Sequence, residues 1–379
     1  MTLHLRLKSQ IKNVARPSWR FLSQFIWRKQ LSRADSIELL KNSIVDEHLS
    51  ESIPMPVLES SNGIVVSTFA ENENAVRNFD YDYVWKLNLD INFKSLKICR
   101  CGVPLINNKL LLDLDFGSYA GLLEFPSKVE VVKYPIVVAP WRNPESTYWD
   151  FVICTLAKLC RVEEALGREI WQEAKVCYPL MHTHFESQFL EKLGISKDSI
   201  IDTQVPHLEV QTECLILANS QSHWVYPSPR DLRLVRNRFI QKREIDKKKK
   251  IYVSRRGRRC VENETEVVEL LKKYDFEIIQ DVKRSVDEQL SLFQEASVIV
   301  TPHGAGLSNL LWCDPGTVVI ELFSGSYTPL YYYYICKVMD LDYSYIVEDT
   351  TVPDHWTNVA HNINVDLEAL QQELDRRFS

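Results

Sequence analysis

The sequence of 379 residues has no apolar run close to the roughly 20 residues that a helix needs to cross a bilayer. It also has no signal-peptide core followed by a small-residue cleavage site. Its nine cysteines form no CxxC pair and no Cys/His spacing typical of zinc sites, so we expect reduced thiols and no metal site. The net charge of −6 gives no indication of nucleic-acid binding. These absences predict a cytoplasmic protein.

Acidic residues are missing from the first part of the chain. Eight Lys/Arg precede Asp35, and no Asp or Glu does. This leader, residues 1–33, also carries Trp and Phe side chains, with Pro17 interrupting the pattern. It is either a helix packed on the first domain with its charges solvated, or a segment that binds the inner face of an anionic membrane. The length allows two domains with ample cores.

The second half of the sequence alternates short apolar runs with amphipathic stretches. This spacing predicts a parallel, doubly wound sheet, in which ligands bind beyond the carboxyl ends of the strands. We expect strands at 251–254, 276–279, 298–300, 317–322 and 343–347, and helices at 263–273, 286–296, 329–339 and 366–378.

The first half is a looser mixture of strands and helices. Its clearest element is a predicted helix over 148–166, with Leu156, Leu159, Val162 and Leu166 in register. The charged run at 241–250 predicts a linker between two domains. We expect further strands at 64–67, 96–98, 110–113, 129–138 and 214–217.

A glycine turn follows the third strand of the second half. In the segment 301–309 (TPHGAGLSN), Gly304 and Gly306 allow backbone N–H groups to approach a ligand closely, and a helix N-terminus favours negative charge. His303 adds a side chain that can donate to a phosphate oxygen. The segment, including the amide of Ala305, therefore predicts a diphosphate site.

The order of motifs in the second half resembles that of the family 61 glycosyltransferases. The resemblance is dense over about 70 residues, weaker over the preceding hundred or so, and absent from the first sixty. The motifs are Tyr252-Val253-Ser254-Arg255-Arg256, Arg258-Arg259, Glu262-Asn263-Glu264, Glu288-Gln289-Leu290, the segment His303 to Asn309, Pro315-Gly316-Thr317 and Ile320-Glu321.

The resemblance implies a GT-B architecture, in which two Rossmann-like domains face each other across a cleft. It also implies inverting, metal-independent transfer of a sugar from a UDP-type donor, without a further cofactor, to a hydroxyl of a glycan or lipid-linked saccharide. We therefore expect an N-terminal helical extension (1–60), an acceptor-side domain (61–245), a donor domain (246–350), and a tail (351–379) that packs back on the first domain.

Arg255 and Arg259 are the candidates for neutralising the leaving diphosphate, because a metal-free transferase needs protein cations for that task. Alternatively, these arginines pair with Glu262 or Glu264 and have a structural role only.

Three further residues of the donor domain have two interpretations each. Asn263 either caps the helix that follows it or contacts the donor. Asn309 contacts ribose or phosphate, or completes the first helical turn. Glu321 accepts hydrogen bonds from ribose hydroxyls, or forms a buried salt bridge, for example with an arginine of the same sheet end.

The catalytic base is expected in the segment 147–152 (TYWDFV), which resembles the family's stretch with Asp150 in place of a common histidine. Asp150 either takes the proton from the acceptor hydroxyl or interacts only with the helix dipole. Tyr148 and Arg142 are the acceptor-side candidates. His182 and His184 are an alternative pair of bases.

The sequence is compatible with two other function classes. One is a non-catalytic protein that binds sugar nucleotides or scaffolds polysaccharide assembly. The other is a nucleotide-dependent oxidoreductase, although no GxGxxG follows the first strand of either half.

Overall fold

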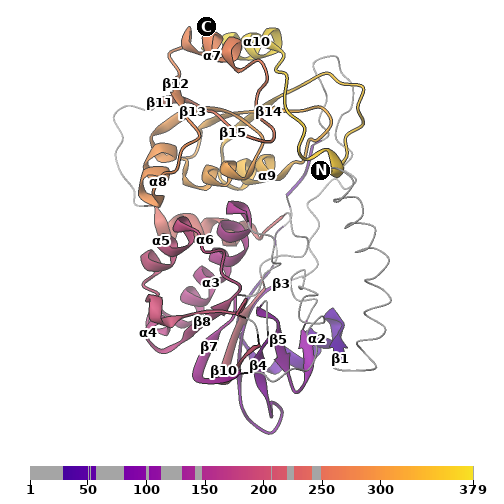
Figure 1. Ribbon diagram of the computed structural model, residues 1–379, viewed down its shortest axis with the longest axis vertical. Helices are drawn as coiled ribbons and strands as arrows, with labels where there is room; N and C mark the ends of the chain where they lie inside the picture. Colours follow the sequence, from indigo (N-terminus) through magenta and orange to yellow (C-terminus); the bar gives the residue numbers. More distant parts are fainter. Residues whose placement is uncertain are drawn as a thin grey trace.

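A computed structural model describes residues 29–49, 51, 53–56, 81–99, 102–111, 130–140, 147–205, 207–219, 226–240 and 249–378. In this part of the chain, two β-sheets lie toward opposite ends of an elongated molecule, with helices stacked between them (Figure 1). We call the ten-stranded sheet with its helices the first unit, and the five-stranded sheet with its helices the second unit. The predicted α/β class, with parallel strands and helices, is confirmed.

The second unit is built on a wholly parallel sheet with the strand order β12-β11-β13-β14-β15. All five predicted strands are present. In chain order the arrangement is 2-1-3-4-5, so the direction of winding reverses between β11 and β13. The strands are β11 (Lys249–Val253), β12 (Glu277–Ile279), β13 (Ala296–Pro302), β14 (Val318–Phe323) and β15 (Asp342–Val347).

The helices of the second unit begin where their sequences provide caps. Ser285 caps α8 (Val286–Glu295) in a capping box with Glu288. The segment after the glycine turn is a 3₁₀ helix, η6 (Ala305–Trp312), so the predicted helix is present in a tighter form. The remaining helices are α7 (Glu264–Lys272), α9 (Tyr331–Val338) and α10 (Leu367–Phe378).

The first unit has a mixed sheet. Its central strand, β10 (Leu208–Ala218), pairs in parallel with β7 (Glu130–Val138), and the parallel arrangement continues through β8 (Lys175–Tyr178) to β9 (Ile200–Asp202). On its other side β10 runs antiparallel to two strands. The flanking strands are β1 (Lys29–Leu31), β2 (Ile44–Leu49), β3 (Tyr81–Asn88), β4 (Leu96–Ile98), β5 (Pro104–Ile106) and β6 (Lys109–Leu111).

The long predicted helix at 148–166 is present, but its first half is a π-helix, η4 (Asp150–Leu156), which continues as α3 (Ala157–Leu166). Single-turn π segments often mark functional sites, and a seven-residue one is unusual. The helix ends at Gly167, whose φ of +84° suits glycine. Other helices of this unit are α2 (Arg33–Leu40), α4 (Ile170–Glu173), α5 (His184–Leu193) and α6 (Pro229–Phe239).

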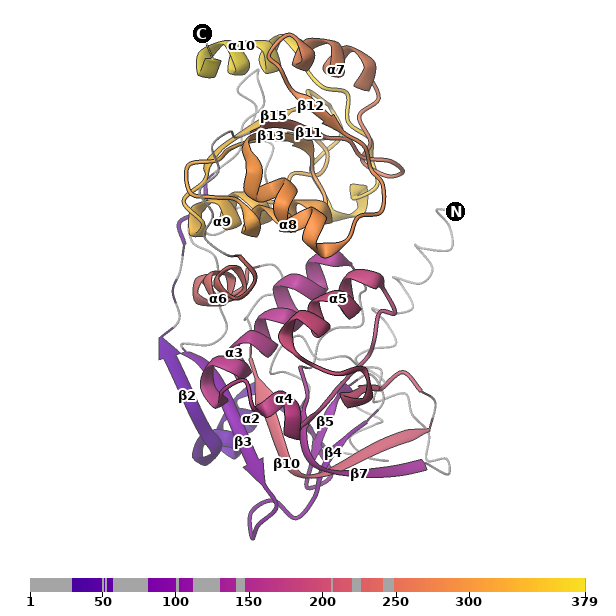
Figure 2. The same ribbon diagram turned by 90° about the vertical axis from the view of Figure 1, so that its left-hand side faces the viewer.

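Helices of the two units form the middle of the molecule. Figure 2 shows α3, α5 and α6 on the side of the first sheet that faces the second unit, and α8 and α9 on the side of the second sheet that faces the first. One hydrophobic cluster joins these layers and includes Trp149, Phe189, Trp312 and Tyr332. The rings of Phe189 and Trp312 stack with centroids 5.9 Å apart.

Two predictions on the domain organisation are wrong, one for the N-terminal segment and one for the C-terminal helix. Residues 29–49 do not form a separate helical extension, because β1 and β2 join the first sheet and Leu31 and Leu40 are buried in its core. The C-terminal helix does not return to the first domain. Leu370 and Leu374 of α10 pack with Val267 of α7 in the core of the second unit.

Several other predictions on the chain's organisation concern residues that the structure does not describe. The expected strand at 64–67, most of the linker and residues 1–28 lie outside the described residues. Among the helices of the described ranges, none has the length and apolar character needed to span a membrane.

Candidate diphosphate site

The predicted donor residues come together where the winding of the second sheet reverses. The loop after β11 carries Arg255 and Arg259, and the loop after the neighbouring β13 carries His303 and Gly304. In doubly wound sheets this position, beyond the carboxyl ends of the strands, is where ligands bind. The topology therefore supports the position that the strand pattern predicted.

Gly304 lies directly against the guanidinium group of Arg255. A Cβ atom at Gly304 would be 1.5 Å from Nη1 and 2.5 Å from Cζ of Arg255. The backbone at Gly304 is extended, with φ 166°, so its conformation does not require glycine. Glycine is required there because the arginine occupies the space of a side chain. The Arg255 Nε atom donates to the carbonyl oxygen of Arg258 at 2.8 Å, which holds the guanidinium in place.

Arg259 is a buried cation, only 6% exposed, without a carboxylate partner in the described part of the chain. Its Nη1 donates to the Val359 carbonyl oxygen at 2.8 Å, and its guanidinium lies 5.7 Å from the centre of the Tyr327 ring. Its Nε atom is buried and has no hydrogen-bond partner. Burial, followed by repulsion from Arg255 and Arg258, lowers the pKa of Arg259 to about 10. An anion beside this group would relieve that penalty.

The alternative in which these arginines pair with nearby glutamates is wrong. Glu264 instead accepts hydrogen bonds from Tyr252 at 2.9 Å and from Ser254 at 2.8 Å. Glu262 accepts from the side chain of Asn362 at 3.4 Å. The described carboxylates therefore leave both arginine side chains without an ion pair, as a binding site for a diphosphate requires.

His303 is held by a chain of buried hydrogen bonds across two strands. Its Nδ1 lies 2.5 Å from Oε1 of Glu321 on β14, and Oε2 of Glu321 accepts from the Tyr343 hydroxyl on β15 at 2.7 Å. Burial raises the pKa of Glu321 well above its usual range and lowers that of His303 well below its own, the latter helped by Arg259 and Arg255. Both shifts favour a neutral pair, in which protonated Glu321 donates to Nδ1 and Nε2 carries the imidazole proton.

This geometry decides between the two interpretations of Glu321 only in part. The salt-bridge alternative gave an arginine of the same sheet end as one example of a partner, whereas the carboxyl group contacts His303. A ribose contact stays a prediction. Glu321 is fully buried and both of its oxygens are engaged, so its observed contacts position the imidazole.

Aromatic rings surround His303 and connect it to the first unit. The imidazole stacks on Phe323 with centroids 5.3 Å apart, and Tyr332 lies 5.2 Å away. Tyr332 in turn meets Trp149 edge-on at 5.4 Å. The sequence showed a tyrosine-rich helix but not this arrangement, because the rings converge only when β14, α9 and η4 pack together. Trp149 therefore places the start of η4 next to the rings around His303.

Asp150, the proposed base, follows Trp149 and takes part in a capping box at the start of the helix. Its Oδ2 accepts from the backbone N–H and the hydroxyl of Thr147, each at 2.8 Å, and its own N–H lies 3.3 Å from Thr147 Oγ1. A structural role for this carboxylate is thus present, and the role as base stays a prediction. Arg142 lies outside the described residues.

The other candidate bases make different contacts. His182 Nε2 lies 2.9 Å from Asp202 Oδ2, and His184 Nε2 lies 2.7 Å from the Arg284 carbonyl oxygen. His184 therefore belongs to the contact between the units.

Asn309 and Tyr148 bond to each other across the two units. The Tyr148 hydroxyl donates to Asn309 Oδ1 at 2.7 Å, and Trp312 Nε1 donates to the same oxygen at 2.9 Å. The Asn309 amide nitrogen donates to the Gly306 carbonyl oxygen at 2.9 Å and to Gln289 at 3.2 Å. In these contacts Asn309 joins the two units and completes the first turn of η6. Both side chains are thus engaged with protein groups, and their contacts with a ligand stay predictions.

Asn263 is the N-cap residue of α7, as predicted, but its side chain makes no capping hydrogen bond. Its amide exchanges two hydrogen bonds of 2.9 Å with the backbone of Val365, which fixes the segment before α10. The amides of Ala305 and Gly306 lie in the first turn of η6, where N–H groups have no acceptor within the helix. They are available to a phosphate.

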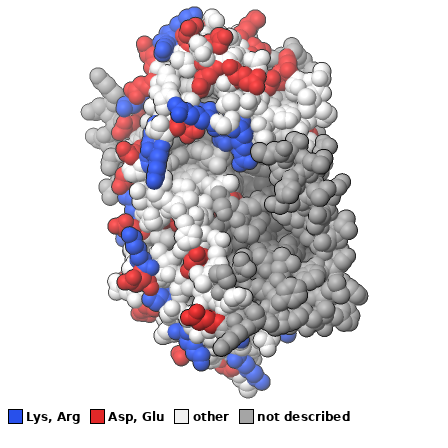
Figure 3. All heavy atoms as spheres, in the orientation of Figure 1, with Lys and Arg blue, Asp and Glu red and all other residues white. Residues whose placement is uncertain are grey.

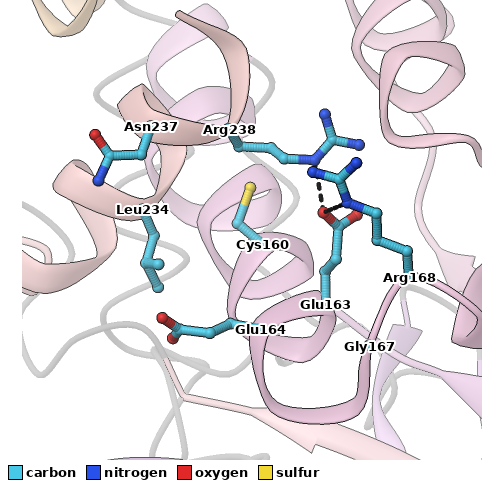
Figure 4. A pocket seen from close by; sticks show the side chains of 8 residues that line it. All are labelled: Cys160, Glu163, Glu164, Gly167, Arg168, Leu234, Asn237 and Arg238. Atoms are coloured by element: carbon cyan, nitrogen blue, oxygen red, sulfur yellow. Dashed lines mark hydrogen bonds and ion pairs between the residues drawn. The ribbon is translucent and has the colours of Figure 1, made fainter.

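Two other features of the first unit lie away from the diphosphate site. Asp46, His48 and Glu164 place ligand atoms within 4.8 Å of one another, but Arg230 pairs with Glu164 and lies 4.0 Å from Asp46, so a cation is already present. Between α3 and α6, a cavity of about 310 Å³ opens over Cys160 (Figure 4). Its lining residues, all from the first unit, are Cys160, Glu163, Glu164, Gly167, Arg168, Leu234, Asn237 and Arg238.

Comparisons with known proteins identify the family of this region. Over 80 residues the chain is 35% identical to beta-1,2-xylosyltransferase RCN11 of Oryza sativa subsp. japonica, a stretch that covers 21% of this chain and only 14% of the rice protein. Residues 135–320 match the family model described as Glycosyltransferase 61, and this range contains Asp150, both site arginines and His303. The chain therefore contains a glycosyltransferase 61 domain, which spans residues 135–320.

Proposed function

We propose that the protein is an inverting, metal-independent glycosyltransferase of GT-B architecture. It moves a sugar from a UDP-type donor to a hydroxyl of a glycan or lipid-linked saccharide. The observation that carries the proposal is the buried guanidinium of Arg259 beside Arg255, both without carboxylate partners, at the carboxyl ends of β11 and β13. Two fixed cations match the charge of a nucleoside diphosphate.

The main change in charge during the reaction occurs at the leaving group. As the bond between the anomeric carbon and the diphosphate breaks, negative charge builds on the phosphate oxygens. Donors that are already oriented stabilise that charge without reorganising. Arg255 and Arg259 supply the positive charge, and the Nε2–H of His303 and the amides of Ala305 and Gly306 supply hydrogen bonds.

On the opposite side of the anomeric carbon, Asp150 takes the proton from the attacking hydroxyl. Its position next to Trp149, which contacts the rings around His303, supports this role. Its hydrogen bonds to Thr147 fix the orientation of the carboxylate. Tyr148 and Arg142 then contribute to the acceptor side, Tyr148 by joining η4 to η6.

The expected cellular location follows from the proposed acceptor. Lipid-linked saccharides are anchored in a membrane, and the basic, aromatic residues 1–33 are suited to anionic lipid at its inner face. We therefore propose a cytoplasmic protein that contacts this face peripherally.

The proposal is tested by exposing the protein to a panel of UDP-sugars. UDP-xylose is included because the rice relative is a xylosyltransferase. A bound donor raises the unfolding temperature by mass action, so the correct sugar gives the largest shift, and NADH gives none. A shift with NADH and none with any UDP-sugar would instead favour an oxidoreductase.

Catalysis is then separated from binding by measuring donor hydrolysis. Asp150→Asn retains an oxygen that can accept from Thr147 but loses its basicity, so we expect the rate to fall by about 10²–10⁴-fold at an unchanged donor Kd. If the wild-type protein binds UDP-sugars but neither hydrolyses nor transfers them, it is a non-catalytic sugar-nucleotide-binding protein.

A further inference from the structure

Next to the two site arginines, the second unit carries more positive charge than a nucleoside diphosphate requires. The surplus comes from two loops, those after β11 and β12, which contain Arg256, Arg258, Lys283 and Arg284. We call these four residues the basic rim. Figure 3 shows Lys and Arg side chains gathered over the lower part of the second unit.

The side chains of the basic rim have no ion pairs with carboxylates in the described ranges. Arg256, Arg258 and Lys283 are exposed. The guanidinium of Arg284 donates to the carbonyl oxygens of Gln280 at 2.8 Å and Val282 at 3.3 Å, which braces its loop.

Some cations elsewhere on this surface have carboxylate partners. Lys192 lies 2.6 Å from Asp287, and Arg233 lies 3.2 Å from Glu51. The basic rim differs from these in that four cations lie close together in two adjoining loops, on a protein whose net charge is −6.

The two loops form one surface. The backbone N–H of Arg256 donates to Asp281 Oδ2 at 2.9 Å, which joins the loop after β11 to the loop after β12. Asp281 and Glu262 are the only acids in these loops, so four cations face two carboxylates. Since Arg255 and Arg259 already match the two charges of the donor diphosphate, the basic rim remains available for a second anion.

The basic rim also lies where the two units meet. The carbonyl oxygen of Arg284 accepts from His184 of the first unit, and the N–H of Val286 donates to Gln188 at 2.6 Å. An acceptor that reaches the donor site from the first unit passes this junction.

We propose that the acceptor is an anionic saccharide, whose carboxylate or phosphate groups bind the basic rim while one hydroxyl faces the donor. This inference rests on the proposed function and specifies its acceptor class. The rim contacts are exposed and therefore individually weak, so they select an acceptor by their number and decline with added salt.

The experiment compares two double variants that each remove two exposed positive charges. Arg256→Ala/Lys283→Ala alters the basic rim, and Lys272→Ala/Lys273→Ala alters the far end of α7 as the matched control. The probes are an oligogalacturonate, its neutral methyl ester, and UDP, each titrated at low and at physiological ionic strength.

We expect the oligogalacturonate to bind the wild-type and control proteins, more weakly at the higher salt, and the methyl ester not to bind. The rim variant should weaken oligogalacturonate binding by about three- to tenfold and change the Kd for UDP by less than about twofold. The proposal is overturned if the methyl ester binds equally well, if neither saccharide binds, or if the control variant weakens binding as much.

A parallel loss of UDP affinity in the rim variant would also overturn the proposal, because the basic rim would then serve the donor. The proposed function fails separately, if UDP does not bind to the wild-type protein at all.

Discussion

Replacing Gly304 by alanine should displace the guanidinium group of Arg255 and leave the backbone in place. The added methyl carbon would lie 1.5 Å from Nη1, whereas non-bonded carbon and nitrogen atoms need about 3.5 Å, so the guanidinium must move by roughly 2 Å. The extended backbone at Gly304 accommodates alanine without strain. The substitution should therefore affect ligand binding much more than folding.

The size of the effect follows from the contact that is lost. A hydrogen bond to a charged group contributes about 1.5–3 kcal/mol, which corresponds to a rise of about 10- to 100-fold in the Kd for UDP. Calorimetric titration of UDP measures it, and thermal unfolding should show a nearly unchanged midpoint.

A double-mutant cycle tests the cause. In an Arg255→Ala background the methyl group of Gly304→Ala meets no guanidinium, so the second substitution should add almost nothing. If the two effects on UDP affinity simply add, or if Gly304→Ala binds UDP like the wild type, the steric reasoning is refuted.

Two further predictions concern buried hydrogen bonds. Glu321→Gln mimics the protonated carboxyl group, so donor affinity should stay within about threefold at pH 7, whereas Glu321→Ala frees His303 and should cost more than about tenfold. The folded-state pKa of Glu321 is raised, so the free energy of unfolding of the wild type should fall relative to that of Glu321→Gln as the pH rises above the ordinary carboxyl range. If the unfolding free energies of the two proteins depend equally on pH, a protonated Glu321 is contradicted. Asn309→Ala leaves the buried Tyr148 hydroxyl and Trp312 N–H without their acceptor, so it should cost about 2–4 kcal/mol of unfolding free energy, measured by denaturant titration. A stability equal to that of the wild type would remove Asn309 from the contact between the units.

The sequence predicted the second unit well because its pattern is local. Each strand is an apolar run and each helix has a periodic face, and the carboxyl ends of parallel strands meet at one edge. Arg255, His303 and the glycine turn could therefore be placed together from the sequence alone. The π-helical geometry of residues 150–156 had no such signal.

Side-chain partners distant in sequence could not be predicted. Asn309 bonds to Tyr148, 161 residues away, and Asn263 bonds to Val365, 102 residues away. The sequence of an amphipathic helix such as α10 shows an apolar face but does not show which unit will cover that face. The need for glycine at 304 likewise depends on where Arg255 lies in three dimensions.

The central claim is that the carboxyl edge of β11 and β13 holds a diphosphate. It is tested most directly by titrating UDP and uridine, in parallel, into the wild-type protein and into Arg259→Ala. We predict that UDP binds the wild type much more tightly than uridine does, and that Arg259→Ala removes most of this difference. If UDP fails to bind at millimolar concentration, or if UDP and uridine bind equally well, the claim is contradicted.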